Sequence, residues 1–219
     1  DGERVFEGVN FAQTSGLTAI PGNSTLEVEV RGILPDQSEV TVIGPVDLTF
    51  AAGERTDVLA INNLFNSSGA LTIEPKVLEP VAIEAGITDV RVTVLHAAPE
   101  VGTVDVYVTA PDDDLANNTP VATLSFGEAA GPVAIAADTQ YQVRITPTGT
   151  LDVVYDSGEA SFPGGTELVL AAVENTFKLR PSPVTLLAIG SDSASQIPDI
   201  ATGAAVRVVH NSADTPAVD

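Results

Sequence analysis

Hydrophobic and polar residues alternate in short runs along most of the chain, which is the pattern of β-strands with one buried face. In 90–94 the valines at alternate positions share one face, and 104–108 has the same arrangement. Seven further runs share the pattern: 26–30, 40–42, 58–61, 121–126, 141–145, 168–173 and 184–189. Glycine, proline, asparagine and aspartate mark turns between them. The sequence therefore predicts an all-β protein built as a β-sandwich.

The chain contains an internal repeat. The run 90–105 recurs as 204–219, with an offset of 114 residues between His96 and His210. Two other segments recur at offsets of 115 and 112 residues: 126–131 matches 11–16, and 162–166 matches 50–54. The repeating unit is therefore about 114 residues long.

We expect neither end of the sequence to coincide with a boundary between repeat units. Residues 87–202 form a complete unit, and residues 1–86 form a unit that lacks its opening strands. Residues 203–219 are the opening strand of a further unit, or a donor strand that completes the first unit of a neighbouring subunit. We expect tandem β-sandwich modules with an unfinished first module.

One motif within the repeat resembles a known family. An alternating strand is followed by histidine, small residues, an acidic residue and Val-Asp before a second alternating strand, in 90–108 and partly in 206–219. This pattern resembles the DUF4397 family, as do the later segments 126–127, 137–143 and 165–168. The resemblance implies immunoglobulin-like β-sandwiches, often in tandem, on secreted or cell-surface proteins. It implies no catalytic residues, because the activity of the family is undefined.

Composition and charge narrow the range of partners. The chain has 30 acidic and 9 basic residues and a net charge of −21, which argues against nucleic acid or an anionic membrane surface as the main partner. It has no cysteine, and no apolar run is long enough to insert into a membrane. No nucleophile, phosphate-loop or zinc-protease motif is present, so we expect no enzymatic activity and no cofactor.

Five residues of the repeat motif are candidates for structural roles. His96 and His210 occupy equivalent positions, which favours one turn hydrogen bond in each unit over catalysis. Asp105 and Asp219 are also equivalent, and a solvated strand face is favoured for them over orientation of the histidine turn. Tyr141 resembles a tyrosine corner, whose hydroxyl pins a sandwich crossover.

Two weaker motifs concern ions and glycans. Asp112, Asp113 and Asp114 offer oxygen ligands of the kind Ca²⁺ prefers, but without the regular calcium-loop spacing, so a solvated acidic turn is favoured. Three Asn-x-Ser/Thr sequons would suit a glycosylated surface protein, and they lie at Asn23, Asn66 and Asn117.

The frame of the repeat leads to a functional hypothesis. A unit without its opening strand exposes a sheet edge and apolar core, and a strand from a neighbour supplies hydrogen bonds and side-chain anchors together. The candidate donor residues are Val206, Val208, His210 and Val218. The connector 191–203 could reach about 43 Å if nearly straight, so closure within one chain would be strained.

We therefore expect an extracellular structural or adhesive protein that binds copies of itself head-to-tail, by strand complementation or by continuation as a longer tandem chain. The alternative is a monomeric cell-surface module that binds a ligand or carbohydrate. Aromatic residues are only 5% of the chain, and tryptophan is absent, which argues against a carbohydrate-binding site that stacks sugars on aromatic rings.

Overall fold

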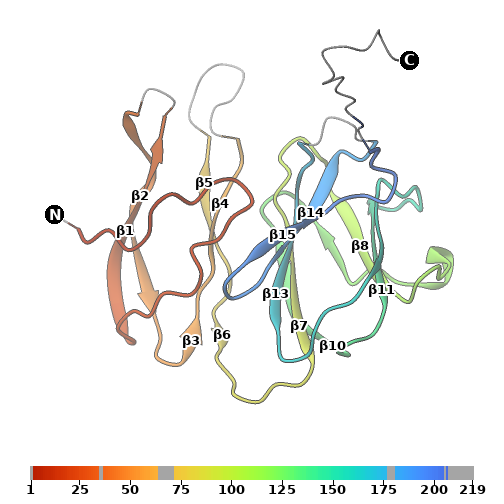
Figure 1. Ribbon diagram of the computed structural model, residues 1–219, viewed down its shortest axis with the longest axis horizontal. Helices are drawn as coiled ribbons and strands as arrows, with labels where there is room; N and C mark the ends of the chain where they lie inside the picture. Colours follow the sequence, from red (N-terminus) through yellow and green to blue (C-terminus); the bar gives the residue numbers. More distant parts are fainter. Residues whose placement is uncertain (1, 35–36, 64–71, 177–180, 205, 207–219) are drawn as a thin grey trace, which may run out of the picture.

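The computed structural model describes residues 2–34, 37–63, 72–176, 181–204 and 206. Its fold is all-β, as expected, and consists of two unequal units (Figure 1). In the described part of the chain, no helix is long and apolar enough to cross a membrane.

The second unit, residues 87–202, is a closed sandwich of two sheets. One sheet has five strands in the order β10-β7-β13-β14-β15, and the other has four in the order β12-β11-β8-β9. Strand β7 pairs in parallel with β13 and antiparallel with β10. The strands are β7 (Val90–His96), β8 (Val104–Thr109), β9 (Ala122–Leu124), β10 (Ala129–Ile135), β11 (Tyr141–Pro147), β12 (Tyr155–Ala160), β13 (Glu167–Glu174), β14 (Val184–Ile189) and β15 (Ala194–Ile197), with a 3₁₀ turn η1 (Leu115–Asn117).

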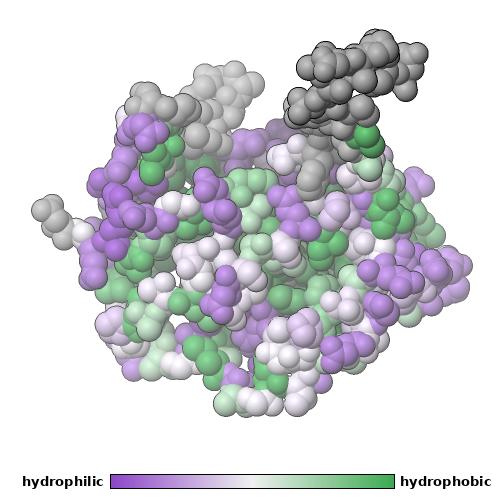
Figure 2. Space-filling model, in the orientation of Figure 1, coloured by the Kyte–Doolittle hydropathy of each residue, from purple (hydrophilic) through white to green (hydrophobic). Residues whose placement is uncertain are grey.

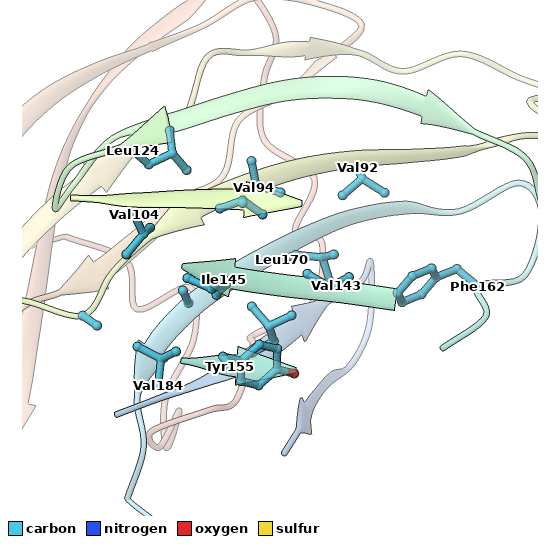
Figure 3. Close-up of a cluster of buried hydrophobic side chains, with 14 of the residues drawn as sticks. Val92, Val94, Val104, Leu124, Val143, Ile145, Tyr155, Phe162, Leu170 and Val184 are labelled. Carbon is cyan, nitrogen blue, oxygen red and sulfur yellow. The ribbon is translucent and has the colours of Figure 1, made fainter. Parts of the chain in front are cut away.

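The core of this unit lies between the two sheets and is made by alternate residues of its strands (Figure 3). Val92, Val94 and Leu170 from the five-stranded sheet face Val143 and Ile145 from the four-stranded sheet. These valine, leucine and isoleucine side chains suit a pleated surface buried on one face, which is why these segments form strands.

Tyr155 is fully buried at one end of this core. Its hydroxyl donates a 2.8 Å hydrogen bond to the carbonyl oxygen of Ile197, at the end of β15. Burial raises the pKa of its phenol, and nearby Asp199 and Asp156 raise it further. The bond therefore joins a neutral phenol of the four-stranded sheet to the edge strand of the other sheet.

The described residues of the first unit, 2–34, 37–63 and 72–86, form three strand pairs instead of two continuous sheets. The long pair is β1 (Ser24–Ile33) with β2 (Glu39–Phe50). The shorter pairs are β4 (Val58–Ile61) with β5 (Glu74–Val77), and β3 (Glu54–Arg55) with β6 (Val81–Ala82). Figure 1 shows β4 and β5 on one side of the five-stranded sheet, with β8 and β11 on its other side.

Candidate functional site: the open first unit

The strand pairs of the first unit correspond to part of the second unit. At an offset of 112, β4 is equivalent to β13, and at an offset of 115, β1 is equivalent to β11. Val58 lies opposite Val77, and Leu170 lies opposite Ala188, so the pairing agrees when β5 is aligned with β14 at an offset of 111, one residue less than the offset of β4 from β13. The first unit thus contains the β11–β12 and β13–β14 parts of the fold.

The equivalents of β7 and β8 are missing from the first unit as the structure describes it. In the second unit β13 is paired on both edges, with β7 and β14, and β11 is paired with β8 and β12. Among the described residues β4 is paired with β5 alone, and β1 with β2 alone. One edge of each strand therefore has no strand beside it.

The same lack explains the irregular chain that precedes β1. In the second unit β9 pairs only with β8, and β10 pairs only with β7. Their equivalents at an offset of 115, residues 7–9 and 14–20, form no strand. Both segments lack the strand that would hold them in a sheet.

The apolar residues that would form a core are exposed in the first unit. Leu170 is 2% exposed whereas its equivalent Val58 is 39% exposed, and Leu124 is 4% exposed whereas Val9 is 43% exposed. Two other members of this set are exposed or half-buried: Ile20 and Val28. We call these four apolar residues of the first unit, Val9, Ile20, Val28 and Val58, the open core. In Figure 2, hydrophobic side chains reach the visible surface of this unit as well as of the second.

The other face of β4 is covered by the second unit. Leu59 and Ile61 pack with Leu95, Val169 and Val173 in a second apolar cluster, which lies on the outer face of the five-stranded sheet. At an offset of 112, Ile61 is equivalent to Val173. The two units therefore pack back to back, through equivalent faces, while the inner face of β4 stays open.

An ionic network joins the same two faces. Arg55 in β3 donates to Glu167 in β13 over 2.5 Å and bonds Asp57 over 3.0 Å. Glu167 also lies 3.8 Å from Arg91, which donates over 2.6 Å to Glu84. The side chains of Arg55 and Glu167 are only 10% and 15% exposed, so this pair is screened less than a surface pair. The hydrogen bond from Arg91 lowers the pKa of the exposed Glu84 carboxyl.

The repeat-motif residues hold turns and crossovers of the second unit. The buried His96 accepts a hydrogen bond at Nδ1 from Ala98 N, and its Nε2 lies 3.0 Å from the carbonyl oxygen of Gly102. Its ring therefore closes the turn after β7, with the proton on Nε2. The hydroxyl of Tyr141 accepts from Ala136 N over 2.9 Å, five residues upstream, as in a tyrosine corner.

The prediction of a solvated face for Asp105 is wrong. Asp105 is buried, and it accepts hydrogen bonds from the Thr123 hydroxyl and from Gly149 N. Neither of these two hydrogen bonds is made with the turn that His96 closes. Asp105 lies in β8, between β9 and β11. Its side chain on the outer face is therefore enclosed by the Thr123 hydroxyl from β9 and by the turn that follows β11.

The acidic triplet forms a structured turn. Asp114 caps η1 by accepting from Ala116 N, and Asp112 N donates to the side chain of Gln142. The buried Arg144 donates to the carbonyl oxygen of Asp113, which fixes the turn against β11. Within the described ranges no group of three or more His, Cys, Asp or Glu residues is placed to hold a metal ion.

The sequons and the donor residues differ in what the structure describes. Asn23 and Asn117 are exposed, and Asn66 lies outside the described residues. Val206 is exposed. Val208, His210, Val218 and Asp219 lie outside the described residues.

The described residues contain two hollows that bear on ligand binding. A small apolar hollow of about 40 Å³ lies in the second unit, lined by the core residues Val92 and Val143 and by the exposed Val121 and Val133. A wider surface hollow of about 430 Å³ lies where Lys76 of the first unit meets β9 and the start of β10, and it is lined without aromatic residues.

The ion pair between the units was missed by the sequence reasoning, although a signal for it existed. Arg55 and Glu167 stand at equivalent repeat positions with opposite charge. Equivalent positions meet only when two units pack through the same face, and nothing in the linear sequence predicts that orientation.

Comparison with known families gave one match. The family model described as a domain of unknown function, DUF4397, matches residues 1–107 and 90–219. The two matches overlap over β7 and most of β8. Comparisons with curated proteins and with solved structures found no match.

The closed and open cores should respond differently to the same substitution. Val143→Ala is expected to lower the free energy of unfolding by about 2 kcal/mol, because it removes two buried carbons and leaves a cavity. Val28→Ala, at the equivalent half-buried position, should cost less than half as much. Urea denaturation followed by far-ultraviolet circular dichroism would measure both, and equal losses would contradict an open first unit.

The ion pair between the units should show a measurable coupling. In a double-mutant cycle, Arg55→Gln and Glu167→Gln should be coupled by about 1–2 kcal/mol, because each change leaves its largely buried partner without its counter-charge. The matched control is the exposed pair Arg31 and Glu29, whose coupling should be smaller. Denaturation of the four variants of each cycle measures the coupling, and indistinguishable values for the two pairs would contradict the proposed contact.

Proposed function

We propose that this protein, which belongs to the DUF4397 family, is an extracellular structural or adhesive protein that assembles head-to-tail by adding a β-strand to its first unit. The donor strand comes from a neighbouring copy, or from a preceding unit where the chain continues as a longer tandem array. The function lies in assembly rather than in catalysis.

One observation carries this proposal, namely the open core next to unpaired strand edges. Strand β4 exposes Val58 on its inner face and has a free edge among the described residues. An unpaired edge beside an apolar face is a template for another strand, which supplies main-chain hydrogen bonds and side-chain anchors at once. A surface suited only to solvent would have polar residues here, as at Glu27 on the other face of β1.

The geometry of such a contact also supports assembly beyond a dimer. The acceptor is the first unit, and the candidate donor segment 204–210 is at the other end of the sequence. A contact between two different surfaces is heterologous, so it continues from copy to copy and forms a filament unless it closes into a ring.

The net charge of −21 influences the conditions of assembly. Neighbouring copies repel each other at low ionic strength, whereas near 1 M salt the Debye length falls to about 3 Å. Strand addition between copies is therefore expected to be stronger in high salt.

The second candidate function is a monomeric module that binds a ligand or carbohydrate, and the surface hollow beside Lys76 is its best site. That hollow lacks the aromatic side chains on which sugars stack. The second candidate therefore has less support than assembly.

Light scattering near 1 M salt would test assembly. The average mass of the intact chain should rise with concentration, and Val208→Asp should reduce this rise strongly, because Val208 corresponds to the buried Val94. Ala201→Asp, which adds the same charge at an exposed position outside the donor segment, is the control and should assemble like the unsubstituted chain.

Two further measurements separate the sources of the strand. Deletion of residues 204–219 should abolish assembly, and polymers of undiminished size would contradict strand donation by these residues. The intact mass of the native chain tests tandem continuation, because a mass far above 22.5 kDa would show a longer covalent array.

A further inference from the structure

The free edge of β4 defines a single strand position with a known counterpart. In the second unit the corresponding edge of β13 holds β7 in parallel, with Leu170 beside Val94 and Ala171 beside Leu95. The next pair is Ala172 beside His96. At an offset of 112 these β13 residues correspond to Val58, Leu59 and Ala60.

The inner and outer faces also correspond along β4. Leu170 and Ala172 point into the closed core, whereas Ala171 packs on the outer face. In β4, Leu59 likewise packs on the outer face, and Val58 is exposed on the inner face. A strand placed beside β4 in the β7 register would therefore put its own inner residues over Val58.

The segment 204–210 has the sequence for this position. At an offset of 114, Val206 and Val208 match Val92 and Val94, which are core residues of β7. Val209 matches Leu95, and His210 matches His96. The match includes both the apolar alternation and the histidine that closes the following turn.

We propose, resting on the assembly function above, that residues 204–210 of a second copy add to β4 as a parallel strand, with Val208 beside Val58, Val209 beside Leu59 and His210 beside Ala60. The other edge of the same donor pairs with residues 14–20, as β7 pairs with β10. This places Ile20, the equivalent of Ile135, in a sheet over the open core.

The donor belongs to a second copy because the structure fixes the chain close to residue 204. Asp199 accepts from Asp156 N in β12, and Thr202 N donates to the carbonyl oxygen of Asp199. Residue 202 is thereby held beside the four-stranded sheet. From there only four residue steps lead to Val206, a reach of about 14 Å.

The distance within one chain is longer than this reach. Strand β4 packs against the outer face of the five-stranded sheet, whereas β12 belongs to the four-stranded sheet behind it (Figure 1). Packed sheets lie about 10 Å apart, so two such spacings, about 20 Å, separate β12 from β4. The connector 191–203 cannot be fully extended, because 194–197 form β15. Closure within one chain would therefore be more strained than the length of this connector alone predicts.

Disulfide trapping would test both the position and the register, since the chain has no cysteine of its own. One chain with Val58→Cys and another with Val208→Cys are mixed near 1 M salt and oxidised with copper-phenanthroline. Directly opposed residues in neighbouring strands lie within disulfide range, so a reducible band at twice 22.5 kDa is expected.

The matched control is a register shifted by one residue. Val58→Cys mixed with Val209→Cys should give roughly tenfold less dimer, because a one-residue shift turns the side chain to the other face. Equal yields from the two mixtures would overturn the register.

The remaining outcomes separate this proposal from the assembly function. Assembly in light scattering without a disulfide in the matched mixture would overturn the β4 position and leave assembly intact. Absence of both would overturn the assembly function itself. A disulfide that forms only within single chains carrying both cysteines would overturn donation by a second copy.

Discussion

A strand inside a β-sheet needs a partner on each of its edges, and in this protein β7 is that partner for both β10 and β13. The same strand also contributes to the closed core and to the contact between the two units. It joins β10 to β13, so the five-stranded sheet is continuous only through it. Its inner residues Val92 and Val94 belong to the closed core, and its outer residue Leu95 belongs to the contact with the first unit. The closed core, the continuous sheet and the packing of the two units all depend on this one strand.

The first unit shows the same fold without such a strand. Its strand pairs keep their register, because hairpin-type pairs hold themselves by local hydrogen bonds. Among the described residues its apolar side chains stay partly exposed, because covering them would require the two pairs to become sheets. The described part of this unit therefore has local pairing without long-range closure. Among the described residues, the outer face of β4 is packed and its inner face is open.

The sequence predicts most of this fold because the core between the sheets is made by apolar residues at alternate positions of the strands. The runs at 58–61 and 184–189 match β4 and β14, and the runs near 90 and 104 match β7 and β8. Strands β10 and β12 are missed, since one contains Gly131 and Pro132 and the other has the polar sequence Tyr-Asp-Ser-Gly-Glu-Ala. These strands form because a neighbour pairs with them, and pairing is a property of the tertiary structure rather than of the local sequence.

The candidate site is predictable to a lesser extent. The repeat predicts that the first unit is unfinished, because aligning it with the complete second unit shows which segments it lacks. It does not predict the buried position of Asp105 or the ion pair of Arg55 with Glu167, since each depends on which strands become neighbours in space. Sequence periodicity describes the faces of a strand, whereas the partner of a polar side chain is fixed only by the topology.

The back-to-back contact of the units restricts how this gene can change. Arg55 and Glu167 hold equivalent repeat positions and meet each other. Recombination between the two repeats that copied either codon onto the other would bring two carboxylates, or two guanidinium groups, together in a largely buried contact. A chain in which the two repeats carried the same residue at this position would therefore be expected to have a weaker contact between its units.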